Sequence, residues 1–241
     1  MKGKVMEIKI LPAFILAAGV VCGGFFPGYF YRQTHMENRS VIVKGLAEQD
    51  VKADLAIWNL KIVVNGNVLQ EVQQTLQTQA NQTSAFLQKQ GFTKEEINFG
   101  PVETNDLMAN PYRDNNAAVA SRFILSQTIS VRTSKVDSVE AALSATNELI
   151  KQNIVFENQT ANYFFTKLNE VKPQMLKAAT ENARQAADEF ARNSNSKVGK
   201  IRNANQGVFS ILPRDDPNAY EPSLINKKVR VVSTVDYFLE D

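Results

Sequence analysis

Apolar residues along the chain recur with two spacings, an alternation typical of strands and a three- to four-residue spacing typical of helices. The alternation predicts strands over residues 41–47, 51–64, 97–103, 123–131, 162–168, 197–212 and 227–239. The helical spacing predicts helices over residues 67–90, 134–150 and 172–193, with a single turn at 93–96. This order of elements predicts an α+β fold, in which largely antiparallel sheets carry helices packed on one face.

The strand predicted over residues 51–64 changes the phase of its alternation. Its apolar positions are odd-numbered as far as Ile57 and even-numbered from Trp58 onwards. Such a switch indicates either a bulge or a change of the surface that the strand contacts. Gly45 breaks the pattern of the preceding strand, and Trp58 is interpreted as a core residue rather than a platform for a ligand.

Short polar motifs mark where the predicted helices begin. Three pairs have the spacing of a capping box: Asn67 with Gln70, Thr93 with Glu96, and Ser134 with Asp137. Gly91 is a natural end for the first helix, because glycine adopts the left-handed conformation without strain. The helix predicted over residues 172–193 has one side made of mostly small residues: Leu176, Ala179, Ala183, Ala186, Ala187 and Phe190. We therefore expect this helix to lie close on a sheet.

Residues 10–31 carry no charge and would span about 33 Å as a helix, enough to cross a bilayer. The apolar core of a cleaved secretory signal is shorter, about 7–15 residues. A lipoprotein signal is excluded because Val20 and Val21 precede Cys22, where small residues are needed. The segment is therefore interpreted as a retained signal anchor, a single transmembrane helix, with a cleaved signal as the alternative.

The charges before this segment predict its orientation. Three lysines and one glutamate precede it, and positive residues favour the cytoplasmic side. Residues 1–9 are therefore expected to be cytoplasmic, residues 32–39 to form a linker, and residues 40–241 to form one exported domain. If the segment is cleaved, that domain is released from the membrane.

Composition excludes several classes of function. Three of the 27 basic residues and one of the 25 acidic residues precede residue 10, so the rest of the chain is formally neutral. A neutral domain lacks the positive field that nucleic-acid binding needs. The only cysteine is Cys22 and the only histidine is His35, which excludes disulfides, histidine-based triads and ordinary zinc sites from the domain.

Carboxylates remain as candidate chemistry. Asp215 and Asp216 in one polar segment, with Asp114 in another, could supply oxygens to a calcium ion or act as an acid–base pair. The favoured interpretation is that they form turns, because Asp and Pro are typical turn residues and no Asp-x-Asp-x-Asp-Gly motif is present. We therefore assign no catalytic, cofactor-binding or metal-binding residue and expect no cofactor.

The first predicted helix has an unusual polar side, rich in glutamine and poor in charge. Its glutamines are Gln70, Gln73, Gln74, Gln77, Gln79, Gln82, Gln88 and Gln90. An uncharged polar surface loses less hydration energy than a charged one when another subunit covers it. Contact with a subunit and simple exposure to solvent both remain open.

Two blocks of the chain resemble the bacterial SIMPL-domain family of envelope proteins, which includes the periplasmic immunogenic protein type. They are the V-x-V-x-G-x-A pattern at residues 41–47, and the alanine-rich helix followed by Val-Gly-Lys-Ile at 198–201. The resemblance covers about residues 40–239. It implies a domain rich in β-α-β units that assembles into ring- or channel-like oligomers, in a bacterial periplasm, with a role in envelope or oxidative-stress defence. No catalytic motif comes with it.

Three hypotheses follow. The first is a non-enzymatic protein, anchored in the inner membrane, whose periplasmic domain forms a homo-oligomer or binds another envelope protein. The second is a monomeric periplasmic module that binds a small ligand between sheet and helices or beneath the two polar segments. The third, an enzyme using Asp114, Asp215 and Asp216, is the weakest of the three.

Overall fold

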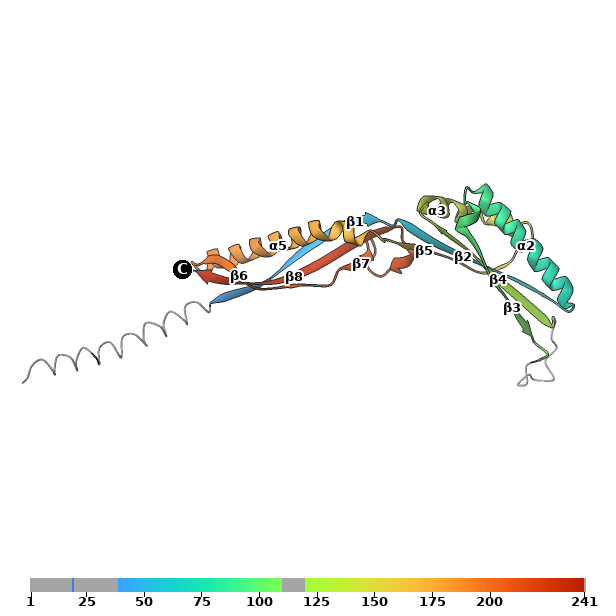
Figure 1. Ribbon diagram of the computed structural model, residues 1–241, viewed down its shortest axis with the longest axis horizontal. Coiled ribbons are helices and arrows are strands. Elements are labelled where there is room, and N and C mark those ends of the chain that lie inside the picture. Colours follow the sequence, from blue (N-terminus) through green and yellow to red (C-terminus); the bar gives the residue numbers. More distant parts are fainter. Residues whose placement is uncertain (1–18, 20–38, 110–119, 241) are drawn as a thin grey trace, which may run out of the picture. The chain divides into compact units, whose positions relative to one another are not determined.

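The computed structural model describes Gly19 and residues 39–109 and 120–240, and it divides the chain into two compact units (Figure 1). The first unit takes its described residues from the chain up to residue 47, from 174–209 and from 231 onwards; the second comprises 48–173 and 210–230. Among the described residues, no helix is both long and apolar enough to cross a membrane. The anchor predicted at 10–31, apart from Gly19, and Asp114 lie outside the described residues.

The first sheet has the strand order β1–β8–β6, formed by β1 (Ser40–Lys52), β8 (Asn226–Glu240) and β6 (Lys197–Gln206). A short strand, β7 (Ser210–Pro213), pairs antiparallel with residues 227–230 of β8. Helix α5 (Leu168–Asn193) runs along the sheet (Figure 1). The core between them is a cluster of Val43, Ala183, Ala187, Val235 and Tyr237.

Helix α5 lies close on β1, as its small residues predict. A Cβ atom at Gly45 would lie 1.9 Å from the carbonyl oxygen of Ala179 and 2.6 Å from the backbone nitrogen of Ala183. The prediction that Gly45 interrupts the strand was wrong, since β1 continues through it. Glycine is required there because the helix backbone occupies the space of a side chain. Phe190 was also wrongly placed on the packed side, since it is 62% exposed.

The second sheet has the strand order β3–β4–β2–β5 and is antiparallel throughout. Its strands are β2 (Leu55–Gly66), β3 (Ile97–Asp106), β4 (Phe123–Thr133) and β5 (Phe156–Phe164). Helices α2 (Leu69–Lys89) and α3 (Val136–Ala145) cover the same face of it (Figure 1). Trp58, Leu60, Ile62, Leu125 and Ile129 are the centre of this core. The predicted α+β class, with antiparallel sheets and helices on one face, is thereby confirmed.

The phase switch near residue 57 marks the passage of the chain from one sheet to the other. Buried positions are odd-numbered in β1 up to Ala47 and even-numbered in β2 from Ala56. Strand β1 ends at Lys52 and β2 begins at Leu55, so the switch is a change of contacted surface rather than a bulge.

Two of the three predicted capping boxes are wrong. Thr93 and Glu96 form theirs around η1 (Lys94–Glu96). Helix α2 starts after Val68 without a side-chain cap, and α3 starts after Lys135 in the same way.

The predicted helix end is confirmed, because Gly91 adopts a φ of 94° just after α2. The helix predicted over residues 134–150 is divided at Thr146 into α3 and the short α4 (Asn147–Ile150). The short η2 (Glu221–Ser223) precedes β8.

Candidate functional site

The solvent side of α2 carries no charge between Glu71 and Lys89. Trp58 and its neighbours bury the opposite side, where Val72, Leu76 and Ala80 are the helix's own core residues. Eight exposed side chains are amides or hydroxyls: Gln73, Gln74, Thr75, Gln77, Thr78, Asn81, Gln82 and Gln88. We call this set the amide face. It runs from Gln73 to Gln88, which is about 24 Å along the helix.

A groove of about 440 Å³ follows the amide face, lined by Glu71, Gln74, Thr78, Gln82 and neighbouring residues. At its edge, the Gln79 side chain donates a hydrogen bond to the carbonyl oxygen of Asn153, at 3.2 Å. The other atom of that amide, Oε1, is buried and has no hydrogen-bond partner among the described residues. A buried acceptor without a donor is costly, but this oxygen is enclosed by the protein and offers no contact to another molecule.

A larger cavity of about 730 Å³ lies at the β5 edge of the second sheet. Its walls come from segments far apart in sequence: Lys52, residues 137–143 of α3, residues 159–163 of β5, and residues 215–226. The Leu143, Ala161 and Ile225 side chains supply apolar wall. The volume lies within the range of about 300–1,000 Å³ that is usual for small-molecule sites.

Acidic groups dominate the wall of this cavity. Four carboxylates, those of Asp137, Glu140, Asp215 and Asp216, face one ammonium group, that of Lys52. Lys52 binds Asp137 at 2.7 Å. Asp215 binds Arg214, and this bond keeps the pKa of the Asp215 carboxyl below its usual value.

The other two carboxylates have no such partner. Glu140 and Asp216 form no ion pair among the described residues. One oxygen of Asp216 accepts the backbone N–H of Asn218 at 2.9 Å, which forms a tight turn. The Glu140 side chain is thus available at the cavity wall.

Tyr163 lies on β5, and its side chain, 4% exposed, lines the cavity. Its hydroxyl has no hydrogen-bond partner among residues 39–109 and 120–240. Burial raises the pKa of the Tyr163 hydroxyl, and the negative charges of Glu140 and Asp137 raise it further. These two carboxylates line the same cavity as the hydroxyl, which stays protonated at neutral pH.

The rim of the cavity is held by a buried charge. The Lys227 side chain is fully buried at the start of β8. Its ammonium donates hydrogen bonds to the backbone carbonyl and the carboxylate of Glu221, in η2. Because an unpaired buried ammonium is very costly, this pair holds η2 against the start of β8.

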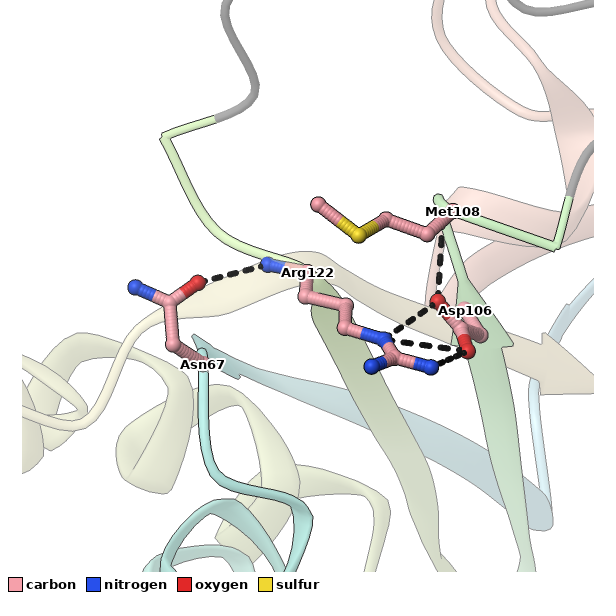
Figure 2. Close-up of polar contacts among 4 residues, drawn as sticks. All are labelled: Asn67, Asp106, Met108 and Arg122. Carbon is pink, nitrogen blue, oxygen red and sulfur yellow. Dashed lines mark hydrogen bonds and ion pairs between the residues drawn. The ribbon is translucent and has the colours of Figure 1, made fainter.

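A second polar cluster joins the facing ends of β3 and β4 (Figure 2). The Arg122 guanidinium donates to both carboxylate oxygens of Asp106, at distances of 2.8–3.2 Å. This pairing holds the pKa of Asp106 below its usual value. The backbone N–H of Arg122 also donates to Asn67 Oδ1, at 2.9 Å. Asn67 therefore anchors a neighbouring strand, which explains why it does not cap α2. The cluster joins the end of β3 to the start of β4 and has a structural role.

The described carboxylates do not form the calcium site that was weighed as the less favoured interpretation. Asp215 binds Arg214. Asp216 accepts a backbone N–H within a turn, as the favoured interpretation proposed. Asp114 lies outside the described residues. Among the residues that the structure describes, no group of three or more His, Cys, Asp or Glu is placed to hold a metal ion. Trp58 is fully buried against Phe92, with ring centroids 6.3 Å apart, and belongs to the core as expected.

Sequence reasoning identified the amide face but missed Glu140 and Tyr163. The amide face follows from local composition, whereas the cavity needs four segments separated by up to about 170 residues to meet. The one local signal for the cavity was Tyr163 itself, which lies on the same face of its strand as Gln159 and Ala161.

Comparison with known proteins adds one finding. The model of the family described as SIMPL, protein of unknown function (DUF541), matches residues 41–236. None of the curated proteins matches the chain.

Proposed function

The chain belongs to the SIMPL family, whose function is unknown, and from this premise we propose that it is a non-enzymatic envelope protein that self-associates. Residues 10–31 would hold it in the bacterial inner membrane, and residues 40–241 would lie in the periplasm. The amide face of α2 would form the contact between copies. A role in envelope or oxidative-stress defence stays a prediction from resemblance alone.

The amide face is the observation that carries this proposal. Most solvent-facing helices carry charged residues, whereas here the exposed side of α2 has none over residues 72–88. The centre of a protein interface is depleted in charged residues, because buried charges must lose their hydration.

Two like charges placed on the amide face test the proposal. We expect Gln74→Glu combined with Gln82→Glu to separate the copies, because opposing carboxylates in one interface repel. The measurement is the mass of the full-length chain in a nonionic detergent, by light scattering over a concentration series. The midpoint concentration of dissociation should rise by about tenfold or more.

The matched control makes the same change on α5, where Gln174→Glu and Gln185→Glu replace two exposed glutamines. This variant has the same added charge but leaves the amide face intact, so it should assemble like the wild type. A wild type that stays monomeric at every concentration would refute the proposal. Equal weakening in the two variants would show that net charge, and not the amide face, controls association.

A second candidate function is binding of a small ligand. The observation that favours it is the 730 Å³ cavity, with its mixed polar and apolar wall. This function does not depend on assembly, since all described wall residues of the cavity come from the second unit of one chain.

A further inference from the structure

We propose that the cavity at the β5 edge binds a small aliphatic amine, with its ammonium group between Glu140 and Tyr163. The inference deepens the second candidate function, ligand binding, and is independent of self-association. The methylene chain of the amine would lie on Leu143, Ala161 and Ile225.

The charge of the wall selects the sign of the ligand. Four carboxylates and one ammonium line the cavity, so an anion would be repelled and a cation attracted. Lys52 and Arg214 already neutralise Asp137 and Asp215. Glu140 and Asp216 remain without an ion pair among the described residues, which leaves unbalanced negative charge facing the cavity.

The Tyr163 side chain is the independent observation that indicates a ligand. It lines the cavity and is almost fully buried, yet its hydroxyl forms no hydrogen bond among the described residues. The hydroxyl oxygen can accept a hydrogen bond, and so can the nearby Glu140 carboxylate. An ammonium group carries three donors and no acceptor, so it matches this pair.

The wall favours an organic cation over a metal ion. A calcium ion needs six to eight oxygen ligands, yet no group of three acidic or metal-binding side chains converges anywhere in the described part of the chain. The apolar side chains of the wall would gain nothing from a hydrated ion. An aliphatic amine provides methylene groups, which these side chains would remove from water.

Three five-carbon compounds that differ only in their end groups test the inference. The probes are cadaverine, which has two ammonium groups, pentane-1,5-diol, which is neutral, and glutarate, which has two carboxylates. Each is titrated calorimetrically into the full-length chain in a nonionic detergent, at low ionic strength. We expect cadaverine to bind at least about tenfold more tightly than the diol, and glutarate not to bind, because charged hydrogen bonds are the stronger ones.

Variants of the wall locate the site. Glu140→Gln should weaken cadaverine binding by about tenfold or more, and Tyr163→Phe by about three- to tenfold, since each removes one acceptor. Glu170→Gln is the matched control, because it removes one exposed carboxylate of the same unit away from the cavity. It should bind cadaverine like the wild type. Circular dichroism of each variant checks that the fold is retained.

The other outcomes overturn the inference. Equal affinity for cadaverine and the diol would remove the role of the carboxylates. Equal weakening by Glu140→Gln and Glu170→Gln would show general attraction of cations to an acidic surface. The double variant Gln74→Glu, Gln82→Glu should keep cadaverine binding, so that failure of self-association and failure of amine binding are separate results.

Discussion

Glu96 shows how a single carboxylate can join three elements. It accepts the backbone N–H of Thr93 at 2.8 Å, the hydroxyl of Thr133 at 2.6 Å and the ammonium of Lys135 at 3.3 Å. Thr93 begins η1, Thr133 ends β4 and Lys135 precedes α3. The local capping motif therefore also positions the start of α3, which carries Asp137 and Glu140 of the cavity wall.

This arrangement predicts a specific dependence of stability on pH. Burial alone would raise the pKa of Glu96, but the bonds from Thr133, Thr93 and Lys135 outweigh it and hold that pKa below its usual value. A depressed folded-state pKa contributes stability above the unfolded value, and this contribution is lost as pH falls through the folded value. Glu96→Gln should therefore lose less stability than the wild type when pH is lowered from about 5 to about 3.

Urea unfolding at several pH values measures this difference, because all other carboxylates contribute equally to both proteins. At neutral pH the variant should be less stable by about 1 kcal/mol, the usual effect of a lost capping interaction. Unfolding midpoints of the two proteins that fall in parallel with pH would contradict the assignment.

Among the elements, α5 depends most on close backbone packing. Its buried residues include Met175, Ala179, Ala183, Ala187 and Ala191, so the helix can approach β1 to the distance at which only glycine fits at position 45. Arg184 extends this contact, since its guanidinium donates to the backbone carbonyls of Val198 and Gly199 in β6. The helix thus contacts the main chain of both β1 and β6.

Gly45→Ala should therefore destabilise the protein by about 3 kcal/mol, because the added methyl group would have to displace the helix backbone. Gly91→Ala is the matched control, since no atom lies within 4 Å of its Cβ position and only the φ of 94° is unfavourable. It should cost about 1 kcal/mol. Chemical unfolding of both variants provides the comparison, and equal losses would show that conformational strain, not the close approach, makes Gly45 necessary.

Local spacing predicted most elements, whereas contacts between distant segments account for the errors. The alternation and the alanine-rich stripe depend on neighbours in sequence, so most strands and helices were predicted in their observed order. The strand predicted over residues 197–212 is wrong, since β6 and β7 are separate strands there, and the strand predicted over 162–168 lies instead at β5 (Phe156–Phe164). Asn67 and Asp137 have the right spacing for capping, but their oxygens accept hydrogen bonds from Arg122 and Lys52, at separations that no local pattern encodes. For the same reason the amide face was predictable and the pair of Glu140 and Tyr163 was not.

For the molecule as a whole, the two units have different kinds of core. The first unit buries a small cluster centred on Val235 and Tyr237, and it relies on close packing of α5. The second unit has the larger core around Trp58 and contains both candidate surfaces, the amide face and the cavity. Function is therefore expected to be concentrated in the second unit.

At the same scale, we expect residues 10–31 to remain part of the mature protein. The uncharged run continues through Phe25, Phe26 and Phe30, beyond the small residues near Cys22 where a signal peptidase would cut, and its length matches a bilayer. The full-length chain should therefore stay in the membrane after an alkaline carbonate wash, with an intact mass of 26.9 kDa.

A variant that carries Phe25→Ala and Pro27→Ala has an Ala-x-Ala site and serves as the matched control, because it should be cut and released. If the wild type is also found shortened and soluble, the anchor is a cleaved signal. In that case, the cavity and the amide face would act in a freely diffusing protein. If only the variant is released, both surfaces are confined to a layer next to the membrane, where the raised local concentration of copies would favour their association.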